Sequence, residues 1–119
     1  AIVAAADKAE ADRLDFKGKR SDERPLSPGQ LLQAKAALEI AFAYDPIKYL
    51  TRPRGIVACH SAWDSGLRFE NGPGAATVDL DFACDNYEAR AGDDEDHGMM
   101  GAAKSELRAL FTEVQEVNR

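Results

Sequence analysis

The strongest hydrophobic pattern lies between residues 27 and 44, where apolar side chains recur at helical spacing in two rows. One row holds Leu31, Ala34, Leu38 and Phe42, and the other holds Leu32, Ala36, Ile40 and Ala43. Ser27 and Gln30 form a capping box around Pro28, which marks the start of a helix. Because this helix is apolar around most of its circumference, we expect it at the centre of the core.

A second amphipathic helix is predicted over residues 98–118, and between the helices the hydrophobic period changes to two. We predict strands over residues 56–60, 67–71 and 77–84, with the Asn71-Gly72-Pro73-Gly74 segment as the tip of a hairpin. The inner faces of these strands carry Val57, Cys59, Leu67, Phe69, Val78, Leu80, Phe82 and Cys84.

The N-terminal part has a weaker pattern. Residues 1–17 read as a marginal helix, and residues 18–26 have the composition of a linker. We therefore divide the chain into an N-terminal helical segment or pro-segment with its linker, residues 1–26, and a single domain, residues 27–119. The expected fold is α+β: a small antiparallel sheet of three or four strands with two main helices on its inner face, and an optional N-terminal helix.

The composition is that of one folded domain, since 45% of the 119 residues are hydrophobic and 30% are charged. The net charge is −6, and residues 55–119 carry 13 acidic but only 5 basic side chains. This balance argues against nucleic acid as a partner, because binding it requires a basic track. No apolar run is long enough to span a membrane. The acidic charge favours a protein partner with a basic surface.

Cys59 and Cys84 are the two cysteines of the chain. Their strands end at the same edge of the predicted sheet, so we expect a disulfide between them, with two buried free thiols as the alternative. The closed loop of about 25 residues gives such a bridge ~3 kcal/mol on the chain-entropy model. A disulfide and the Ala-rich N-terminus, with an Ala-x-Ala pattern, favour a secreted or periplasmic protein.

Signatures of catalysis and of cofactor binding are absent from the sequence: it lacks nucleophile elbows, zinc motifs and phosphate-binding loops. A small hydrolase or ribonuclease-like site could still be assembled from His60, Arg68, Glu70 and His97. The acidic run at residues 93–97 lacks the spacing of a calcium loop, and we expect it to cap the C-terminal helix instead of holding a metal.

Loop aromatic and basic residues are the candidate binding positions. Trp63 lies in a predicted loop, and Tyr49, Arg52 and Arg54 cluster in the connection from helix to strand. The sequence thus favours a small, exported, non-enzymatic protein that binds another protein, as an effector, inhibitor, immunity protein or accessory subunit does. The alternatives are the hydrolase and a structural subunit that docks through its N-terminal helix. The oligomeric state is open.

Overall fold

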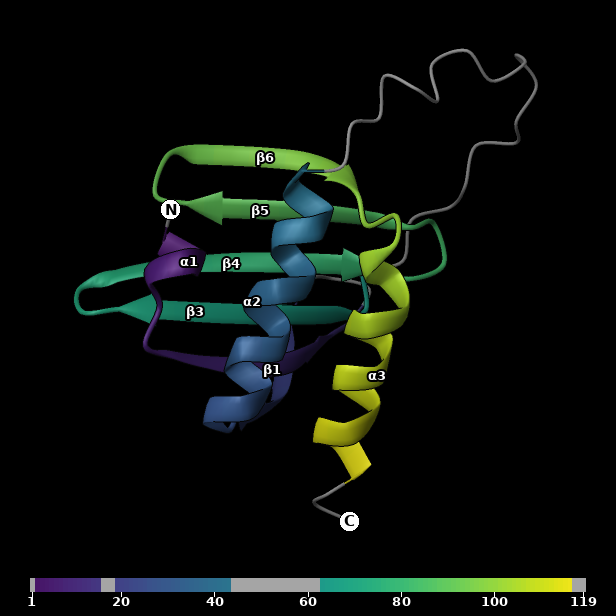
Figure 1. The fold of residues 1–119 in the computed structure, drawn as a ribbon, viewed down its shortest axis with the longest axis horizontal. Coiled ribbons are helices and arrows are strands. Elements are labelled where there is room, and N and C mark those ends of the chain that lie inside the picture. Colours follow the sequence, from purple (N-terminus) through teal and green to yellow (C-terminus); the bar gives the residue numbers. More distant parts are fainter. Residues whose placement is uncertain (1, 16–18, 44–62, 117–119) are drawn as a thin grey trace.

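The computed structural model describes residues 2–15, 19–43 and 63–116, and its centre is one antiparallel sheet (Figure 1). The sheet has six strands in the order β2-β1-β3-β4-β5-β6. Their bounds are β1 Lys8–Leu14, β2 Arg20–Pro25, β3 Ser65–Asn71, β4 Gly74–Asp81, β5 Asn86–Ala91 and β6 Asp94–Met99. The predicted sheet of three or four strands is therefore wrong, because both ends of it were missed.

Three helices accompany the sheet: α1 Ile2–Ala5, α2 Pro28–Ala43 and α3 Ala103–Glu116. In Figure 1, α2 and α3 lie side by side on one face of the sheet and run across the strands. The predicted capping box is confirmed: the backbone N–H of Gln30 donates to Ser27 Oγ at 3.2 Å, and the N–H of Ser27 donates to Gln30 Oε1 at 2.9 Å. No helix among the described residues is long and apolar enough to cross a membrane.

The N-terminal helix predicted over residues 1–17 is wrong beyond its first turn. Strand β1 occupies Lys8–Leu14 and pairs with β2 on one side and with β3 on the other. Ala9 and Ala11 are buried in the core, so sheet pairing and packing outweigh the helical propensity of the segment. The predicted linker at residues 18–26 contains β2. Residues 8–14 and 20–25 thus belong to the same sheet as the central strands.

The acidic segment before α3 is a hairpin and not a helix cap, so that prediction is also wrong. Strands β5 and β6 pair antiparallel, and Gly92, with φ 60°, allows the tight turn between Ala91 and Asp94. The carboxylates of residues 93–96 consequently lie on this turn and on the edge strand. The first turn of α3 contains a single acidic residue, Glu106.

The central hairpin is confirmed at its tip, but the strand predicted over residues 77–84 is wrong at its end, because β4 ends at Asp81 and Cys84 lies in the turn that follows. Asn71 pairs with Gly74 across the turn, where Gly72 has a φ of 56°. The expected inner-face residues of β3 and β4 are fully buried, namely Leu67, Phe69, Val78 and Leu80. The strand predicted over residues 56–60, with Val57, lies outside the described residues. So does Cys59, and its disulfide with Cys84 remains a prediction.

Only one of the two apolar rows of α2 enters the core as expected, and its last member, Phe42, is 36% exposed. Ala34 and Leu38 are buried from this row, together with Ala37 and Ala41. The other row faces solvent: Leu32 is 68% exposed, Ile40 is 48% exposed, and Ala36 and Ala43 are also exposed. The expectation that α2 is surrounded by core is therefore wrong for half of its circumference.

An ion-pair network ties the N-terminal hairpin to the middle of the sheet on the face opposite the helices. Arg20 of β2 donates through Nη1 to both carboxylate oxygens of Asp12, at 2.9 and 3.0 Å, and through Nη2 to Asp79 at 2.6 Å. Gly66 lies between these two aspartates in the strand register, and a Cβ there would clash with the Asp12 carboxylate and the Arg20 guanidinium. The absence of a side chain at Gly66 makes room for Arg20.

Burial and charge act in opposite directions in this network. Burial raises the pKa of Asp12, although Arg20 counteracts it. Burial also acts to lower the pKa of Arg20, but its hydrogen bonds and ion pairs with Asp79 and Asp12 raise that pKa overall. Because the Asp12 side chain is only 3% exposed, its negative charge depends on Arg20 for compensation.

Replacing Arg20 with alanine should destabilise the fold by about 2–3 kcal/mol, because Asp12 would be left buried without its cation. Arg68→Ala is the matched control: its ion pair with Glu70, at 3.5 Å, is on the same face, but the Arg68 side chain is 53% exposed. We expect less than about 1 kcal/mol from the control. Urea unfolding measures both, and equal losses in the two variants would contradict the role given to Arg20.

Candidate functional site

A groove runs along α2 on the side that faces α1, away from α3 (Figure 1). Its volume is about 630 Å³, and we call it the α2 groove. Its lining consists of Val3, Ala4, Leu32, Lys35, Ala36, Glu39, Phe42 and Ala43. Most of these side chains are apolar, and they include members of the exposed row of α2. The face of α2 that no other described element covers is thus bordered by a concave surface.

At the C-terminal end of α2 the groove meets a second hollow, which shares Val3 and Phe42 with it. This edge hollow has a volume of about 270 Å³ and lies over the inner face of β5 and β6. Its other lining residues are Ala76, Ala89, Arg90, Ala91, Asp94, Glu95 and Asp96. Alanine side chains line the floor of this hollow. Because they are small, they leave a space that larger side chains at the same positions would fill.

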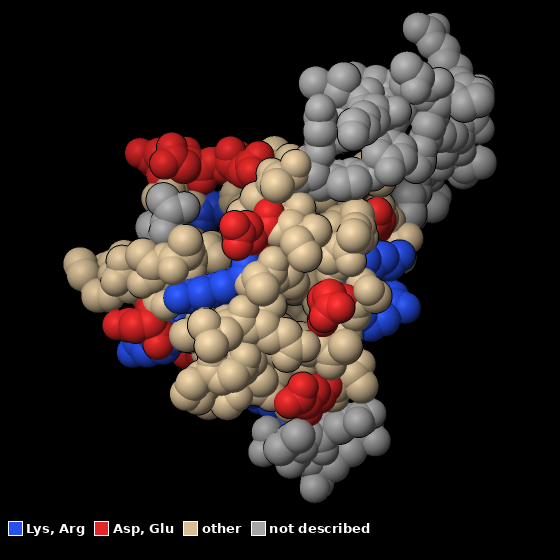
Figure 2. All heavy atoms as spheres, in the orientation of Figure 1, with Lys and Arg blue, Asp and Glu red and all other residues tan. Residues whose placement is uncertain are grey.

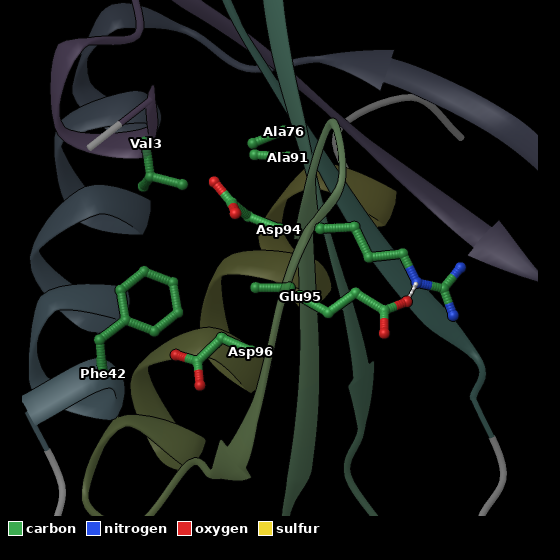
Figure 3. A pocket seen from close by; sticks show the side chains of 9 residues that line it. Val3, Phe42, Ala76, Ala91, Asp94, Glu95 and Asp96 are labelled. Carbon is green, nitrogen blue, oxygen red and sulfur yellow. Dashed lines mark ion pairs between the residues drawn. The ribbon is translucent and has the colours of Figure 1, made fainter.

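Two carboxylates form the rim of the edge hollow. In the strand register Asp96 is opposite Ala89 and Asp94 is opposite Ala91, which places both aspartates on the inner face. Figure 3 shows them on the side of β6 where Val3 and Phe42 lie. Glu95 points to the other side, where its carboxylate pairs with Arg90 Nε at 3.2 Å. Asp94 and Asp96 therefore lie on the inner face of β6, and Glu95 lies on its outer face.

Tyr87 contacts two residues of the edge hollow, Phe42 and Asp96. Its ring packs edge-on against Phe42, with centroids 5.3 Å apart, and its hydroxyl donates to Asp96 Oδ2 at 3.3 Å. Gly98 is opposite Tyr87 in the register, and a Cβ there would lie 2.6 Å from the Tyr87 ring. Burial, and then the charge and hydrogen bond of Asp96, raise the pKa of Tyr87 to about 12. At neutral pH the tyrosine is a neutral donor to Asp96.

The charges around the groove are predominantly negative. Lys35 Nζ donates to the backbone carbonyl of Ala4 at 3.2 Å and to that of Ala6, so this cation caps the C-terminal end of α1. Glu39, Asp94 and Asp96 are exposed carboxylates at the groove and its edge hollow. Figure 2 shows a largely uncharged face with acidic side chains gathered at the β6 edge. The site combines an apolar floor with an acidic rim.

The residues of the hydrolase alternative do not converge. Arg68 and Glu70 lie on the outer face of β3, where Glu70 pairs with Lys8 at 3.0 Å. His97 lies on the outer face of β6, three strands away, which corresponds to about 14 Å. His60 lies outside the described residues. Within the part of the chain that the structure describes, no group of three or more His, Cys, Asp or Glu side chains is placed to hold a metal ion.

The loop residues predicted to bind a partner lie elsewhere. Tyr49, Arg52 and Arg54 are outside the described residues. Trp63 is half-buried and lines a shallow hollow of about 350 Å³ with Tyr87, His97 and other β5–β6 residues. This hollow lies at the start of β5 and the end of β6, and Trp63 does not line the α2 groove. The groove was missed, although the two apolar rows of α2 and the alternation of Tyr87, Ala89 and Ala91 with polar residues were visible signals.

Tyr87→Phe should reduce the loss of stability at high pH. A neutral tyrosine is favoured in the folded state, so its contribution is complete below pH 10 and disappears as the pH rises towards about 12. The free energy of unfolding of the wild type should therefore fall more steeply over this range than that of the variant, which keeps the ring. Urea titrations at a series of pH values test this. Parallel curves would contradict the burial of the Tyr87 hydroxyl.

Comparisons with known proteins identify no relative. No family model matches the chain, and neither a curated protein nor a solved structure matches it. The groove, its exposed apolar row and its acidic rim therefore provide the basis for assigning a function.

Proposed function

We propose that the protein is a small, exported, non-enzymatic domain that acts by binding another protein in the α2 groove. The observation that carries the proposal is the exposed apolar row of α2, in which Leu32 is 68% and Ile40 is 48% exposed. Soluble monomers rarely leave a contiguous apolar surface uncovered, and such surfaces mark interaction sites. Here the row borders a concave surface, into which side chains of a partner can pack.

Burial of the exposed apolar side chains of α2 by a partner can supply enough free energy for binding. Full burial of a leucine, isoleucine or phenylalanine side chain contributes about 1.5–3 kcal/mol. Leu32 and Ile40 are largely available for this, and Phe42, at 36% exposed, can bury the remainder of its ring. A few such residues in one patch commonly supply most of the free energy of a protein–protein contact. Leu32 and Phe42 line the α2 groove, and Ile40 is exposed on the same helix outside its lining.

The charge pattern favours a basic partner. The chain carries a net charge of −6, and the carboxylates at the groove add a local negative potential. Complementary charge accelerates association and selects against acidic proteins. An inhibitor, effector, immunity protein or accessory subunit acts by this kind of contact. The export component of the proposal rests on the predicted Cys59–Cys84 bridge.

The two alternative functions receive less support. A docking subunit was expected to use an N-terminal helix, but α1 has four residues and contacts β3 and β4 of its own sheet. Of the hydrolase residues that the structure describes, Arg68 and Glu70 lie on β3, and His97 lies three strands away on β6. Binding through the groove uses the surface that the fold leaves uncovered.

Site-specific photo-crosslinking in the producing cells tests the proposal. A benzophenone amino acid in place of the exposed Ala36 should give a covalent adduct with a second protein. The same group at Thr112, which is exposed on α3, should give none. Mass spectrometry of the adducts identifies the partner. Equal adducts at both positions, or none at Ala36, would contradict the proposal.

A groove variant completes the test. Leu32→Gln combined with Ile40→Gln should abolish the Ala36 adduct and change the free energy of unfolding by less than about 1 kcal/mol, because both side chains are exposed. Leu38→Ala, on the buried face of the same helix, should cost about 2–5 kcal/mol. A loss of stability in the double variant equal to that of Leu38→Ala would mean that the exposed row serves the fold.

A further inference from the structure

The shape and the charge of the α2 groove indicate which kind of partner segment it binds. This inference rests on the proposed function. We infer that the groove binds an amphipathic helix of the partner, with lysine or arginine side chains at the end that lies over β6. Two independent features support this assignment. The first is the absence of free backbone groups along the body of α2, and the second is the pairing of a small apolar hollow with Asp94 and Asp96.

The walls of the groove favour a helix over an extended segment. Backbone groups in the body of α2 are paired within the helix, so the groove offers side chains and no ladder of free donors and acceptors. An extended peptide in such an apolar groove would bury its own backbone groups without partners, whereas a helix satisfies them internally. Ala36 and Ala43 are small residues between larger ones, and leave holes for the side chains of a packed helix.

On its other side, α2 already packs against a helix of this chain. Helix α3 lies beside α2 on the sheet, and buried Leu107, Leu110 and Phe111 belong to the shared core. On the α1 side a four-residue helix covers only part of the sheet. A partner helix in the groove would occupy the place that a third long helix takes in a layer. The 16 residues of α2 correspond to a length of about 24 Å, which sets the length of the expected contact.

The edge hollow determines the charge of the occupant. Its floor of Ala76, Ala89 and Ala91 and its Phe42 wall suit the aliphatic part of a long side chain. Asp94 and Asp96 lie on the same side of β6, two residues apart, and stand at the rim of this hollow (Figure 3). A lysine or arginine can thus bury its methylene groups against the floor and place its cationic group at the carboxylates.

Two other occupants fit less well. A second copy of the chain would bring the acidic rims of two grooves together, and like charges oppose such a contact. Among the described strands β6 is at the edge of the sheet, and a strand added there would lie beside the inward carboxylates of Asp94 and Asp96. Inward charges on an edge strand are a common means by which proteins prevent this pairing. A basic amphipathic helix avoids both difficulties.

Selection from a random peptide library tests the inference and does not require the identity of the partner. The full-length protein is used as bait for displayed peptides of about 16 residues, the length of α2. We expect the enriched sequences to repeat apolar residues at helical spacing and to carry lysine or arginine towards one end. Enrichment of acidic peptides, or of peptides with alternating apolar and polar residues, would overturn the inference.

A synthetic peptide of the most enriched sequence then allows measurement of affinity by fluorescence polarisation. Asp94→Asn combined with Asp96→Asn should weaken binding about tenfold, which corresponds to about 1.4 kcal/mol. Glu88→Gln is the matched control, because Glu88 lies on the opposite face of the neighbouring strand β5, where it pairs with Arg90, and it does not line the hollow. The control should bind as the wild type does. Equal affinities of the wild type and the double variant would contradict the basic contact.

The double variant at Leu32 and Ile40 separates failure of this inference from failure of the proposed function. If the glutamine substitutions weaken binding but the asparagine substitutions do not, the groove binds a partner whose helix is not basic. If neither pair changes the affinity, the groove is not the binding site and both proposals fail. A dimer that the glutamine substitutions dissociate would assign the groove to a second copy and overturn the inference.

Discussion

The coverage of one sheet face by two helices is the constraint on which the rest of the structure depends. Strand β4 has eight residues and is therefore about 26 Å long, whereas packed helices lie about 10 Å apart. Helices α2 and α3 run across the strands and cover the middle and one end of this length (Figure 1). At the other end α1 contributes only four residues. The groove is the space that this short layer leaves uncovered.

The residues around the uncovered space have the composition of a protein surface. They do not have the composition of a hydrophobic core that lacks a covering helix. The inner face of β5 and β6 carries alanines and two aspartates in place of large apolar side chains. Among the described residues, the large apolar side chains that remain exposed are on α2, and include Leu32 and Ile40. The opposite face of the sheet requires no helix, since charged side chains cover it and Arg20 links three of its strands. The unpartnered apolar surface is thus concentrated along one side of one helix.

The elements that could be predicted from the sequence are those whose local signals agree with their tertiary role. The capping box at Ser27, the hairpin around Gly72 and the amphipathic pattern of α3 each specify one structure. Strand β1 could not be predicted in this way, because its alanines, lysine and glutamate favour a helix in isolation. Only pairing with β2 and β3 makes it a strand. The edge strands β2 and β6 are polar and bury little, so they lack a hydrophobic pattern.

The candidate site was missed for a related reason. The sequence shows that α2 is apolar around most of its circumference, but it does not show how many neighbours surround the helix. Assuming a complete layer placed the row of Leu32 and Ile40 inside the core. The aspartates of β6 were assigned to a helix cap because their strand was not recognised. Both errors follow from the number and placement of strands, which are properties of the whole sheet.

The central claim is that the apolar row of α2 is open to solvent in the free protein. Methyl relaxation by a soluble gadolinium complex, measured by NMR on the full chain, tests this most directly. We expect strong broadening of the Leu32 and Ile40 methyl signals and little effect on Leu38, which is fully buried in the same helix. Leu32 and Ile40 methyls protected to the extent of Leu38 would show that the row is already covered, and would contradict the account.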